Sequence, residues 1–224
     1  MIEVKNIVKT FKDGPRETRV LKGIDLSVAN GEYVAVMGRS GAGKSTLLYQ
    51  ISLLDEPTSG EIRINGKEAH LMSEHEKMLF RLAEFGYVFQ DYALLPELTA
   101  LENVALPLYM QGASRAAADE KASAALTRVG LGSRLNNLPS QLSGGEQQRV
   151  SISRAIAHTP DVLFADEPTA NLDKESSATV MNIFTELHKG GQTIIMVTHE
   201  DEFAAFAERI IKIDDGRVVS DTKI

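Results

Sequence analysis

A glycine-rich run near residue 40 is the strongest chemical signal in the chain. It reads Gly38-Arg39-Ser40-Gly41-Ala42-Gly43-Lys44-Ser45-Thr46 and fits the pattern G-x-x-x-x-G-K-[ST]. Glycines let backbone N–H groups wrap phosphate oxygens, and a helix start adds the positive end of its dipole. Lys44 would reach the β- and γ-phosphates of a nucleotide, and the Ser45 hydroxyl would bind Mg²⁺. The alternative is an ordinary glycine-rich turn between a strand and a helix.

Two acidic residues follow the apolar run Val162–Ala165, namely Asp166 and Glu167. Residues at the carboxyl end of a parallel strand line the ligand crevice of an open α/β sheet. We therefore expect Asp166 to hold Mg²⁺ through water and Glu167 to act as general base on an attacking water. An acidic pair is also typical of a solvated helix start, so this interpretation depends on the phosphate loop.

A third motif, LSGGEQQ, covers Leu142–Gln148. Ser143 and Glu146 have the spacing of a capping box, which predicts a helix start. A capping box does not call for Gly144 and Gly145, because each glycine costs about 1 kcal/mol of helix propensity. We interpret the two glycines as an exposed nest of amides that receives an anion, with a well-capped helix as the alternative.

The pattern of apolar residues predicts the elements that must position these groups. Short apolar or alternating runs in the first third predict strands, and Asn65-Gly66 predicts a tight hairpin after Glu61–Ile64. A helical run follows the phosphate loop, and the stretch from Thr99 to His158 is helical in pattern. The predicted early strands and helix are Ile2–Val8, Val20–Val28, Tyr33–Met37 and Ser45–Ile51.

Strands and helices alternate after residue 160, which predicts a parallel sheet with crossover helices. Asp215-Gly216 predicts a second hairpin turn close to the C-terminus. The alternating elements are expected at Val162–Ala165, Lys174–Lys189, Thr193–Val197, Glu200–Ala207 and Arg209–Ile213.

Composition limits the classes of function. The 224 residues carry 24 Lys and Arg against 31 Asp and Glu, for a net charge of -7, which argues against non-specific nucleic-acid binding. Cysteine is absent, so thiolate metal sites and disulfides are excluded. Charges at Glu3, Lys5 and Lys9 interrupt any signal-peptide core, and no apolar run reaches the length of a membrane span. We expect any membrane association to go through a partner.

Taken together, the phosphate loop, LSGGEQQ, LFADEP and the isolated His199 resemble the nucleotide-binding subunits of ABC (ATP-binding cassette) transporters over essentially the whole chain. The resemblance implies an α/β fold: a P-loop ATPase core with a mostly parallel sheet, an N-terminal antiparallel β subdomain and an inserted helical subdomain. The core and β subdomain would occupy approximately 1–90 and 160–224 of a single domain, and the helical subdomain approximately 91–159.

The resemblance also implies roles for single residues. Phe11 occupies the position that stacks on the adenine of ATP, where many members carry Tyr. Gln90 matches the glutamine that contacts Mg²⁺ and the attacking water, and His199 matches the histidine that contacts the γ-phosphate. With Glu167 and Lys44, these two residues would form the catalytic set. Four other histidines match no motif, and we expect them at the surface: His70, His75, His158 and His188.

In this family ATP lies between two copies of the chain. Ser143, Gly144, Gly145 and Gln147 would cap the γ-phosphate of ATP held by the other copy. Asp173 matches the loop that crosses between the copies. Each copy would therefore hold half of each site in a homodimer that closes on ATP and opens after hydrolysis.

Three further segments are similar to the branch that contains lipoprotein-release and macrolide-export ATPases: Leu94–Val104, Pro107-Leu108 and Pro168–Asp173. The resemblance implies a subunit on the cytoplasmic face of the inner membrane, held there by an integral membrane permease that docks near Gln90–Pro107, with no nucleic-acid partner. Gln90-Asp91-Tyr92-Ala93 departs from the lipoprotein-release pattern and is somewhat like the cell-division ATPase. A cell-division role without transport is therefore the alternative. ATPases of DNA repair or translation are disfavoured, because the chain has no coiled-coil insertion and no second cassette.

Overall fold

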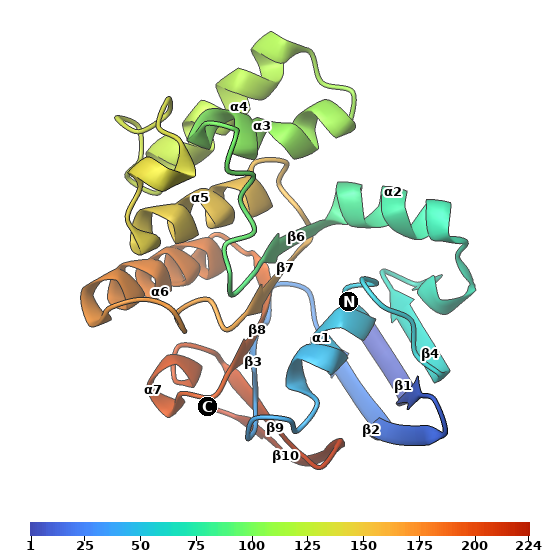
Figure 1. Cartoon of the computed structure of the whole chain (residues 1–224). Coiled ribbons are helices and arrows are strands. Elements are labelled where there is room, and N and C mark those ends of the chain that lie inside the picture. The colour runs from blue at the N-terminus through green and yellow to red at the C-terminus, as the bar shows by residue number, and fades with distance from the viewer. The chain divides into compact units, whose positions relative to one another are not determined.

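The computed structural model describes residues 1–224, which form two compact units (Figure 1). Unit 1 contains residues 1–81 and 191–224, and unit 2 contains residues 82–190. The subdomain boundaries expected from the sequence stay a prediction. None of the helices is both long enough and apolar enough to cross a lipid bilayer.

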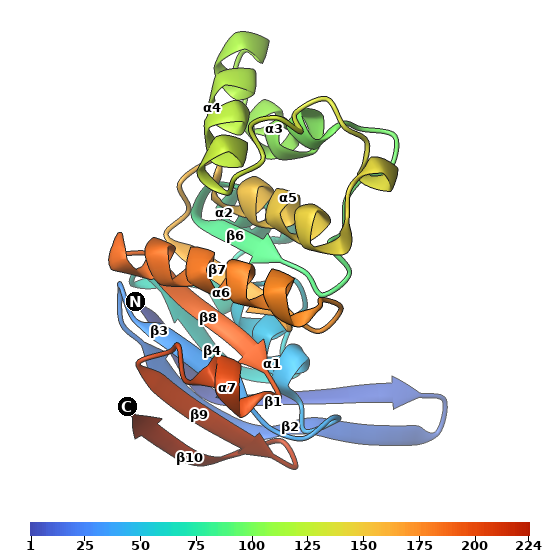
Figure 2. The ribbon, with the colours of Figure 1, turned by 90° about the vertical axis from the view of Figure 1, so that its left-hand side faces the viewer.

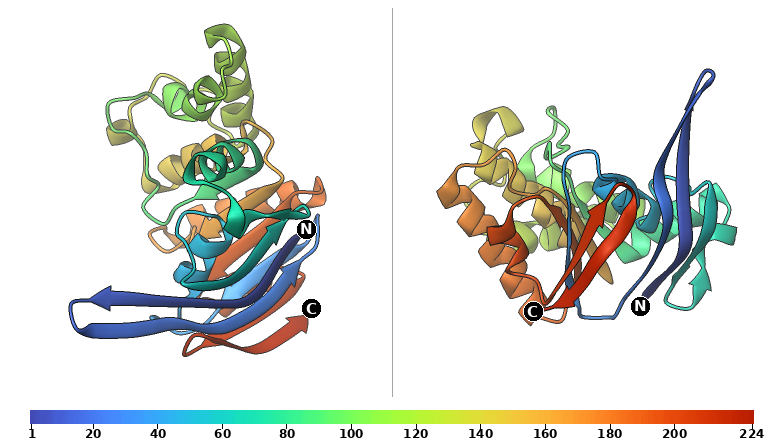
Figure 3. Two further views of the ribbon diagram at one scale, coloured as in Figure 1. Left: turned by 90° about the vertical axis from the view of Figure 1, so that its right-hand side faces the viewer. Right: turned by 90° about the horizontal axis from the view of Figure 1, so that it is seen from below.

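An antiparallel sheet of order β2-β1-β4-β5 opens unit 1. The strand β1 (Ile2–Asp13) pairs with β2 (Arg16–Val28) on one side and with β4 (Ser59–Ile64) on the other. Pairing with β4 stops at Val8, whereas pairing with β2 continues to Asp13. The last part of the β1–β2 hairpin therefore projects beyond β4, as Figure 3 shows. The short elements after β4 are β5 (Lys67–Glu68), η1 (Ala69–Leu71) and α2 (Glu74–Glu84).

The second sheet of unit 1 has the order β10-β9-β3-β8. Its central strand β3 (Tyr33–Met37) pairs in parallel with both β8 (Thr193–Thr198) and β9 (Arg209–Asp214), and every residue of β3 and β8 is buried. β10 (Arg217–Lys223) closes the edge in antiparallel pairing with β9. The two helices attached to this sheet are α1 (Lys44–Ile51) and the short α7 (Asp201–Ala204).

Unit 2 combines a pair of parallel strands with helices. β6 (Phe85–Val88) pairs with β7 (Val162–Asp166). A Cβ on Gly86 would overlap the carbonyl oxygen of Ala155, so glycine lets β6 and its covering helix approach closely. Figure 2 shows α3, α4 and α5 gathered together, and their buried apolar side chains form one core. The helices are α3 (Ala100–Met110), α4 (Arg115–Arg128), η2 (Pro139–Gln141), α5 (Gly144–Ile156) and α6 (Lys174–Lys189).

Most of the expected elements are present, with three differences. β3 and α6 have the predicted bounds, and the two predicted hairpin turns have the positive φ angles that a type I′ turn requires. β1 and β2 run farther into their hairpin than predicted. The helix α2 was not predicted, and α7 spans only Asp201–Ala204 instead of Glu200–Ala207.

Candidate nucleotide-binding site

The phosphate loop joins β3 to α1 by a path that only glycine can follow. Gly38, Gly41 and Gly43 have φ angles of 157°, 77° and 103°. A Cβ on Gly38 would overlap the carbonyl oxygen of Ile213, and one on Gly43 would lie 3.0 Å from Leu21 Cδ2. The spacing of the glycines in the motif is therefore explained by backbone geometry and by close packing.

The helix that follows this loop begins without a side-chain cap, because its N-cap residue is Gly43. The Lys44 side chain is only 6% exposed and turns back over the loop, where its Nζ donates to the Arg39 carbonyl oxygen at 3.2 Å. Ser45 and Thr46 are half-buried in the first turn. A cation and a helix start thus face one loop, which is the arrangement that binds a polyphosphate. The residues present fit a nucleoside triphosphate.

The parallel pairing in unit 1 places His199 at the same edge of the sheet as the phosphate loop. Met37 pairs with Thr198, so Gly38 and His199 are the residues that directly follow two adjacent parallel strands. His199 is exposed, and the next amide, that of Glu200, donates to Thr198 Oγ1 at 3.1 Å. Unit 1 therefore brings the loop and this histidine together at the carboxyl ends of its strands, where α/β sheets bind ligands.

Phe11 lies in the projecting part of the β1–β2 hairpin, where it pairs with Thr18. Its side chain is 46% exposed, which is unusual for an aromatic ring on a sheet. The ammonium of Lys9 lies 5.0 Å from the ring centroid. An exposed phenyl ring offers a flat surface on which a base can stack.

In unit 2 the parallel pairing of β6 and β7 places Gln90 and the acidic pair Asp166 and Glu167 at the same edge of these two strands. Val88 pairs with Ala165, so the two chain segments that leave β6 and β7 do so side by side. Asp166 is buried, whereas the Gln90 side chain is exposed. Glu167 is half-buried and has a φ angle of 45°, a left-handed conformation that costs energy for a residue with a Cβ.

The start of α5 forms the capping box that the sequence predicts. Ser143 Oγ accepts from the Glu146 amide at 3.2 Å, and Glu146 Oε2 accepts from the Ser143 amide at 2.8 Å. The bond from the Ser143 backbone, with help from Arg134 at 3.1 Å, holds the pKa of Glu146 below its usual value. A capping box is thus present, and the anion nest stays a prediction.

The structure supplies a second reason for the two glycines. A Cβ on Gly144 would lie 2.9 Å from the Tyr92 hydroxyl, and one on Gly145 would lie 2.5 Å from Ser176 Oγ. Close packing against Ser176 therefore requires glycine at position 145 whatever ligand binds, whereas at position 144 the obstacle is the end of the Tyr92 side chain. Gln147 is half-buried, and its amide donates to the Leu142 carbonyl oxygen at 3.1 Å.

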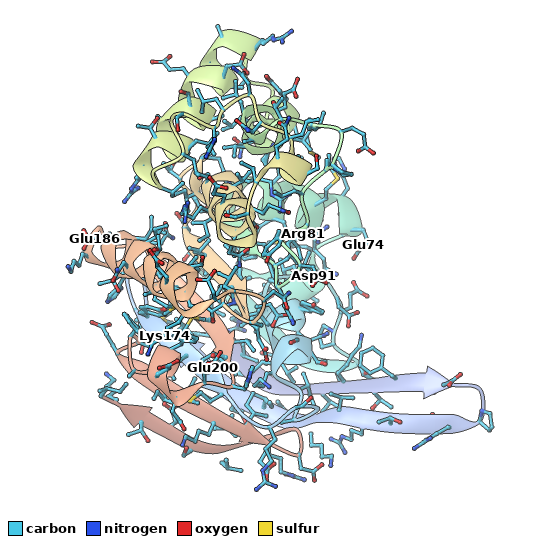
Figure 4. The ribbon with its side chains drawn as sticks, turned by 60° about the vertical axis from the view of Figure 1, so that its left-hand side comes forward. Glu74, Arg81, Asp91, Lys174, Glu186 and Glu200 are labelled. Atoms are coloured by element: carbon cyan, nitrogen blue, oxygen red, sulfur yellow. The ribbon has the colours of Figure 1, made fainter.

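Asp173 is the N-cap of α6, which runs from Lys174 past Glu186 (Figure 4). Its Oδ1 accepts from the Ser176 amide at 2.8 Å, and its Oδ2 accepts from Ser176 Oγ at 3.1 Å. These hydrogen bonds lower the pKa of Asp173, so the carboxylate stays ionised while it caps the helix. The loop before α6 also contacts the segment after β6, because Asn171 Nδ2 donates to the Gln90 carbonyl oxygen at 3.2 Å.

Three polar residues to which the sequence motifs assign no role hold the loops of unit 2. Gln148 is fully buried and donates from Nε2 to the Pro168 carbonyl oxygen at 2.7 Å. The guanidinium of Arg154 donates to the carbonyl oxygens of Tyr92, at 3.0 Å, and Ala93. Asn103 is buried and bonds the backbone of Leu95 through both ends of its amide, at 2.8 Å and 3.1 Å.

The Arg154 contact stabilises an unusual turn. Tyr92 and Ala93 have φ angles of 61° and 50°, so two consecutive residues with side chains adopt the left-handed conformation. Burial lowers the pKa of Arg154 from the usual arginine value. The only sequence signal for Arg154 is a polar residue on a helix, and its partners lie far away in the chain.

The histidines outside the motifs are less exposed than expected. Only His75 is exposed, whereas His70, His158 and His188 are half-buried. His158 Nε2 lies 3.0 Å from the Phe85 carbonyl oxygen, and burial lowers the pKa of its imidazole. These three histidines are therefore only partly at the surface, and two of them contact backbone groups, His70 at Ile62 and His158 at Phe85.

Comparison with known proteins places this arrangement in context. The profile of the family described as ABC transporter matches residues 21–170. An uncharacterized ABC transporter ATP-binding protein of Methanocaldococcus jannaschii is 49% identical over 219 residues, which cover 98% of each chain. The lipoprotein-releasing system ATP-binding protein LolD of Aquifex aeolicus is 47% identical over 99% of this chain and 97% of its own.

Longer proteins and solved structures are also similar. The macrolide export ATP-binding/permease protein MacB of Chlorobaculum tepidum is 46% identical over 100% of this chain, which covers 34% of MacB. Among solved structures, a dimeric ATP-binding cassette in a post-hydrolysis state, bound to ADP and Pi, is 40% identical with a TM-score of 0.93 over 100% of this chain and 98% of its own. This likeness confirms the α/β P-loop ATPase fold expected from the sequence.

Proposed function

This chain belongs to the ABC transporter family, in the branch of lipoprotein-release and macrolide-export ATPases, and we propose that it hydrolyses ATP with residues shared between two copies. It is an ATP-binding, ATP-hydrolysing subunit that drives a membrane permease. The observation that carries the assignment is the phosphate loop, where three glycines with positive φ lead to buried Lys44 and to a helix start without a side-chain cap. This loop would bind the phosphates through residues 38–46, and Phe11 would stack on the adenine.

We assign Mg²⁺ to oxygen ligands from three residues: the Ser45 hydroxyl, the Gln90 amide and, through water, the Asp166 carboxylate. All three offer the hard oxygen donors that Mg²⁺ prefers, and Asp166 ends a buried strand, as expected of an acid that meets a cation. When bound there, the ion would supply positive charge against the phosphate oxygens.

Glu167 is the proposed general base. It would accept a proton from water as the water oxygen attacks the γ-phosphorus, and the bond from that phosphorus to the β–γ bridging oxygen would break to give ADP and phosphate. Its left-handed backbone fits this role, since strain of this kind collects at functional sites. Lys44 and His199 would stabilise charge on the γ-phosphate, and Gln90 would orient the water.

The other half of each site would come from the second copy. Ser143, Gly144, Gly145 and Gln147 would face the γ-phosphate across the dimer, with Asp173 in the loop that crosses between copies. Support comes from the capped helix start at Ser143, which aligns backbone amides, and from the likeness to a cassette solved as a dimer with ADP and Pi.

The permease would dock on the segment between Gln90 and Pro107, at the cytoplasmic face of the inner membrane. Leu95 is 43% exposed there and Pro96 is exposed, whereas Leu94 packs against the helical core of unit 2. Arg154 and Asn103 fasten this segment on either side of Leu94. A displacement of Leu95 by the permease would therefore be transmitted to Gln90 through the residues between them, which these hydrogen bonds hold in place. The names of the relatives point to release of lipoprotein or export of macrolide as the process that this subunit would drive.

Two single variants, Lys44→Ala and Glu167→Gln, test this function. Without its ammonium the loop should lose ATP affinity by at least about tenfold, since charge-assisted bonds to phosphate are strong. Glu167→Gln should keep ATP affinity and lose hydrolysis by at least about a hundredfold, because it removes the base alone. Lys5→Ala, at an exposed position of β1, is the control for loss of a charge. ATP affinity of Lys44→Ala within about twofold of the parent, which is roughly 0.4 kcal/mol, would contradict the assignment.

A further inference from the structure

A chain of polar contacts in unit 1 joins the phosphate-loop helix to the Phe11 ring. Gln50, in the last turn of α1, donates from Nε2 to Asp55 Oδ2 at 2.8 Å. Asp55 in turn accepts from the Lys9 ammonium at 2.7 Å, and that ammonium lies 5.0 Å from the centroid of the Phe11 ring. Four side chains from three segments thus form one connected path.

The Lys9 ammonium is fixed more firmly than is usual for a lysine on a strand. Besides the ion pair with Asp55, it donates to the Glu56 carbonyl oxygen at 2.6 Å, and its side chain is only 12% exposed. Burial alone would raise the pKa of Asp55, but the hydrogen bonds from Lys9 and Gln50 hold it below its usual value. The carboxylate is therefore ionised at neutral pH and keeps the lysine in place.

The Phe11 ring, in contrast, lies on the part of the hairpin that has passed the end of β4. No third strand covers the ring from that side, and the side chain is 46% exposed. An exposed ring samples several rotamers, and a base that stacks on it must select one of them. The cation over one face favours the rotamer in which the other face is open.

We propose that Lys9 is a positioning residue for nucleotide binding: held by Asp55 and Glu56, it supports one face of the Phe11 ring so that the opposite face receives the adenine. This inference rests on the proposed function, in which Phe11 stacks on the base. Because Gln50 ties Asp55 to α1, the helix that begins at the phosphate loop, the same path sets the ring relative to the phosphate end of the site.

Equilibrium binding of ATP and of inorganic tripolyphosphate to a set of variants tests the proposal. Lys9→Met removes the cation and keeps the chain length, and Lys9→Arg keeps a cation over the ring. Lys12→Met is the matched control, because it removes the same charge from the same hairpin at an exposed residue that pairs with Glu17. Phe11→Ala, alone and combined with Lys9→Met, completes a double-mutant cycle. Asp55→Asn loosens Lys9 without removing its charge, and it serves as the test variant if Lys9→Met does not fold.

We expect Lys9→Met to bind ATP about two- to fivefold more weakly, the range of an exposed cation–π contact, with tripolyphosphate binding unchanged. Lys9→Arg should restore most of the affinity, Lys12→Met should match the parent, and Lys9→Met should have no further effect once Phe11 is Ala. Asp55→Asn should weaken ATP binding in the same direction.

Three results would overturn the proposal while Phe11→Ala still weakens ATP binding: normal ATP affinity in Lys9→Met, an equal loss for tripolyphosphate, or a loss that persists in the Phe11→Ala background. An equal loss for tripolyphosphate would mean that Lys9 acts on the phosphates. A loss that persists in the Phe11→Ala background would mean that Lys9 does not act through the ring. Normal ATP affinity in Phe11→Ala would instead remove the adenine role of Phe11, and with it the proposal, while the Lys44→Ala result would still decide whether the loop binds ATP.

Discussion

Gly145 of α5 and Ser176 of α6 lie so close together that a Cβ on the glycine would come within 2.5 Å of Ser176 Oγ and 2.8 Å of Ser176 Cβ. Ser176 is itself fixed, because its hydroxyl and its amide both bond the N-cap carboxylate of Asp173. The first turns of α5 and α6 are therefore in close contact. The second glycine of LSGGEQQ has a packing role as well as the proposed phosphate role.

Gly145→Ala tests the packing role. The added methyl has no room, so we expect a loss of roughly 1–3 kcal/mol in the free energy of unfolding. The double variant Gly145→Ala/Ser176→Gly removes the obstructing side chain and should recover most of that loss. The methyl would occupy the space that the Ser176 side chain leaves, and the Gly145 amide is unchanged, so ATP hydrolysis should recover together with stability. Thermal melting and steady-state hydrolysis measure the two effects, and hydrolysis that stays low in a double variant of restored stability would contradict a packing role alone.

Leu94→Glu and Leu95→Glu form a matched pair that tests the docking segment. Leu94 packs against the helical core, so a charge there should destabilise the chain by at least about 2 kcal/mol. Leu95 is exposed, so the same change should leave the melting temperature and the hydrolysis by the isolated chain close to the parent values. It should, however, weaken co-purification with the permease. A Leu95→Glu chain that unfolds, or that still binds the permease normally, would contradict the docking assignment.

The elements that could be predicted are those with strong local signals. Tyr33–Met37 is a short apolar run, and Lys174–Lys189 begins with an Asp N-cap. The turn at Asn65-Gly66 requires positive φ at both residues, which this pair tolerates. The helix Glu74–Glu84 was not predicted because its first turn is charged, although Ser73 and Glu76 form a capping box there. The end of the β1–β2 hairpin was missed because both of its faces are exposed, so no alternation of apolar residues marks it.

The residues of the candidate site also fall into those that a local sequence signal identifies and those that it does not. Residues within a motif, such as Lys44 or Asp166, could be named because the chemistry demands a fixed local spacing. Arg154 and Lys9 could not, because each acts through a partner that only the fold brings near: the Tyr92 carbonyl for one, Asp55 and the Phe11 ring for the other. A polar residue at a buried position is the signal that remains, and it does not identify the partner.

His158 predicts a pH dependence of stability. Burial lowers the pKa of its imidazole in the folded chain, so below about pH 6.5 the unfolded chain binds a proton that the folded chain does not. Stability from this residue is therefore unaffected above pH 7 and falls as the pH drops from about 6.5 toward the lowered pKa. His158→Gln should flatten the melting temperature between pH 7 and pH 5.5 relative to the parent. His75→Gln, at an exposed histidine, should not change the profile.

The central claim is that ATP is bound between two copies of this chain, and light scattering during size exclusion of Glu167→Gln tests it most directly. With the base removed, bound ATP persists, and its γ-phosphate should recruit Ser143, Gly144 and Gly145 of a second copy. The account predicts a molar mass near twice that of the chain with ATP and a single-chain mass with ADP. A Glu167→Gln chain that binds ATP to saturation and keeps the single-chain mass at high protein concentration would contradict it.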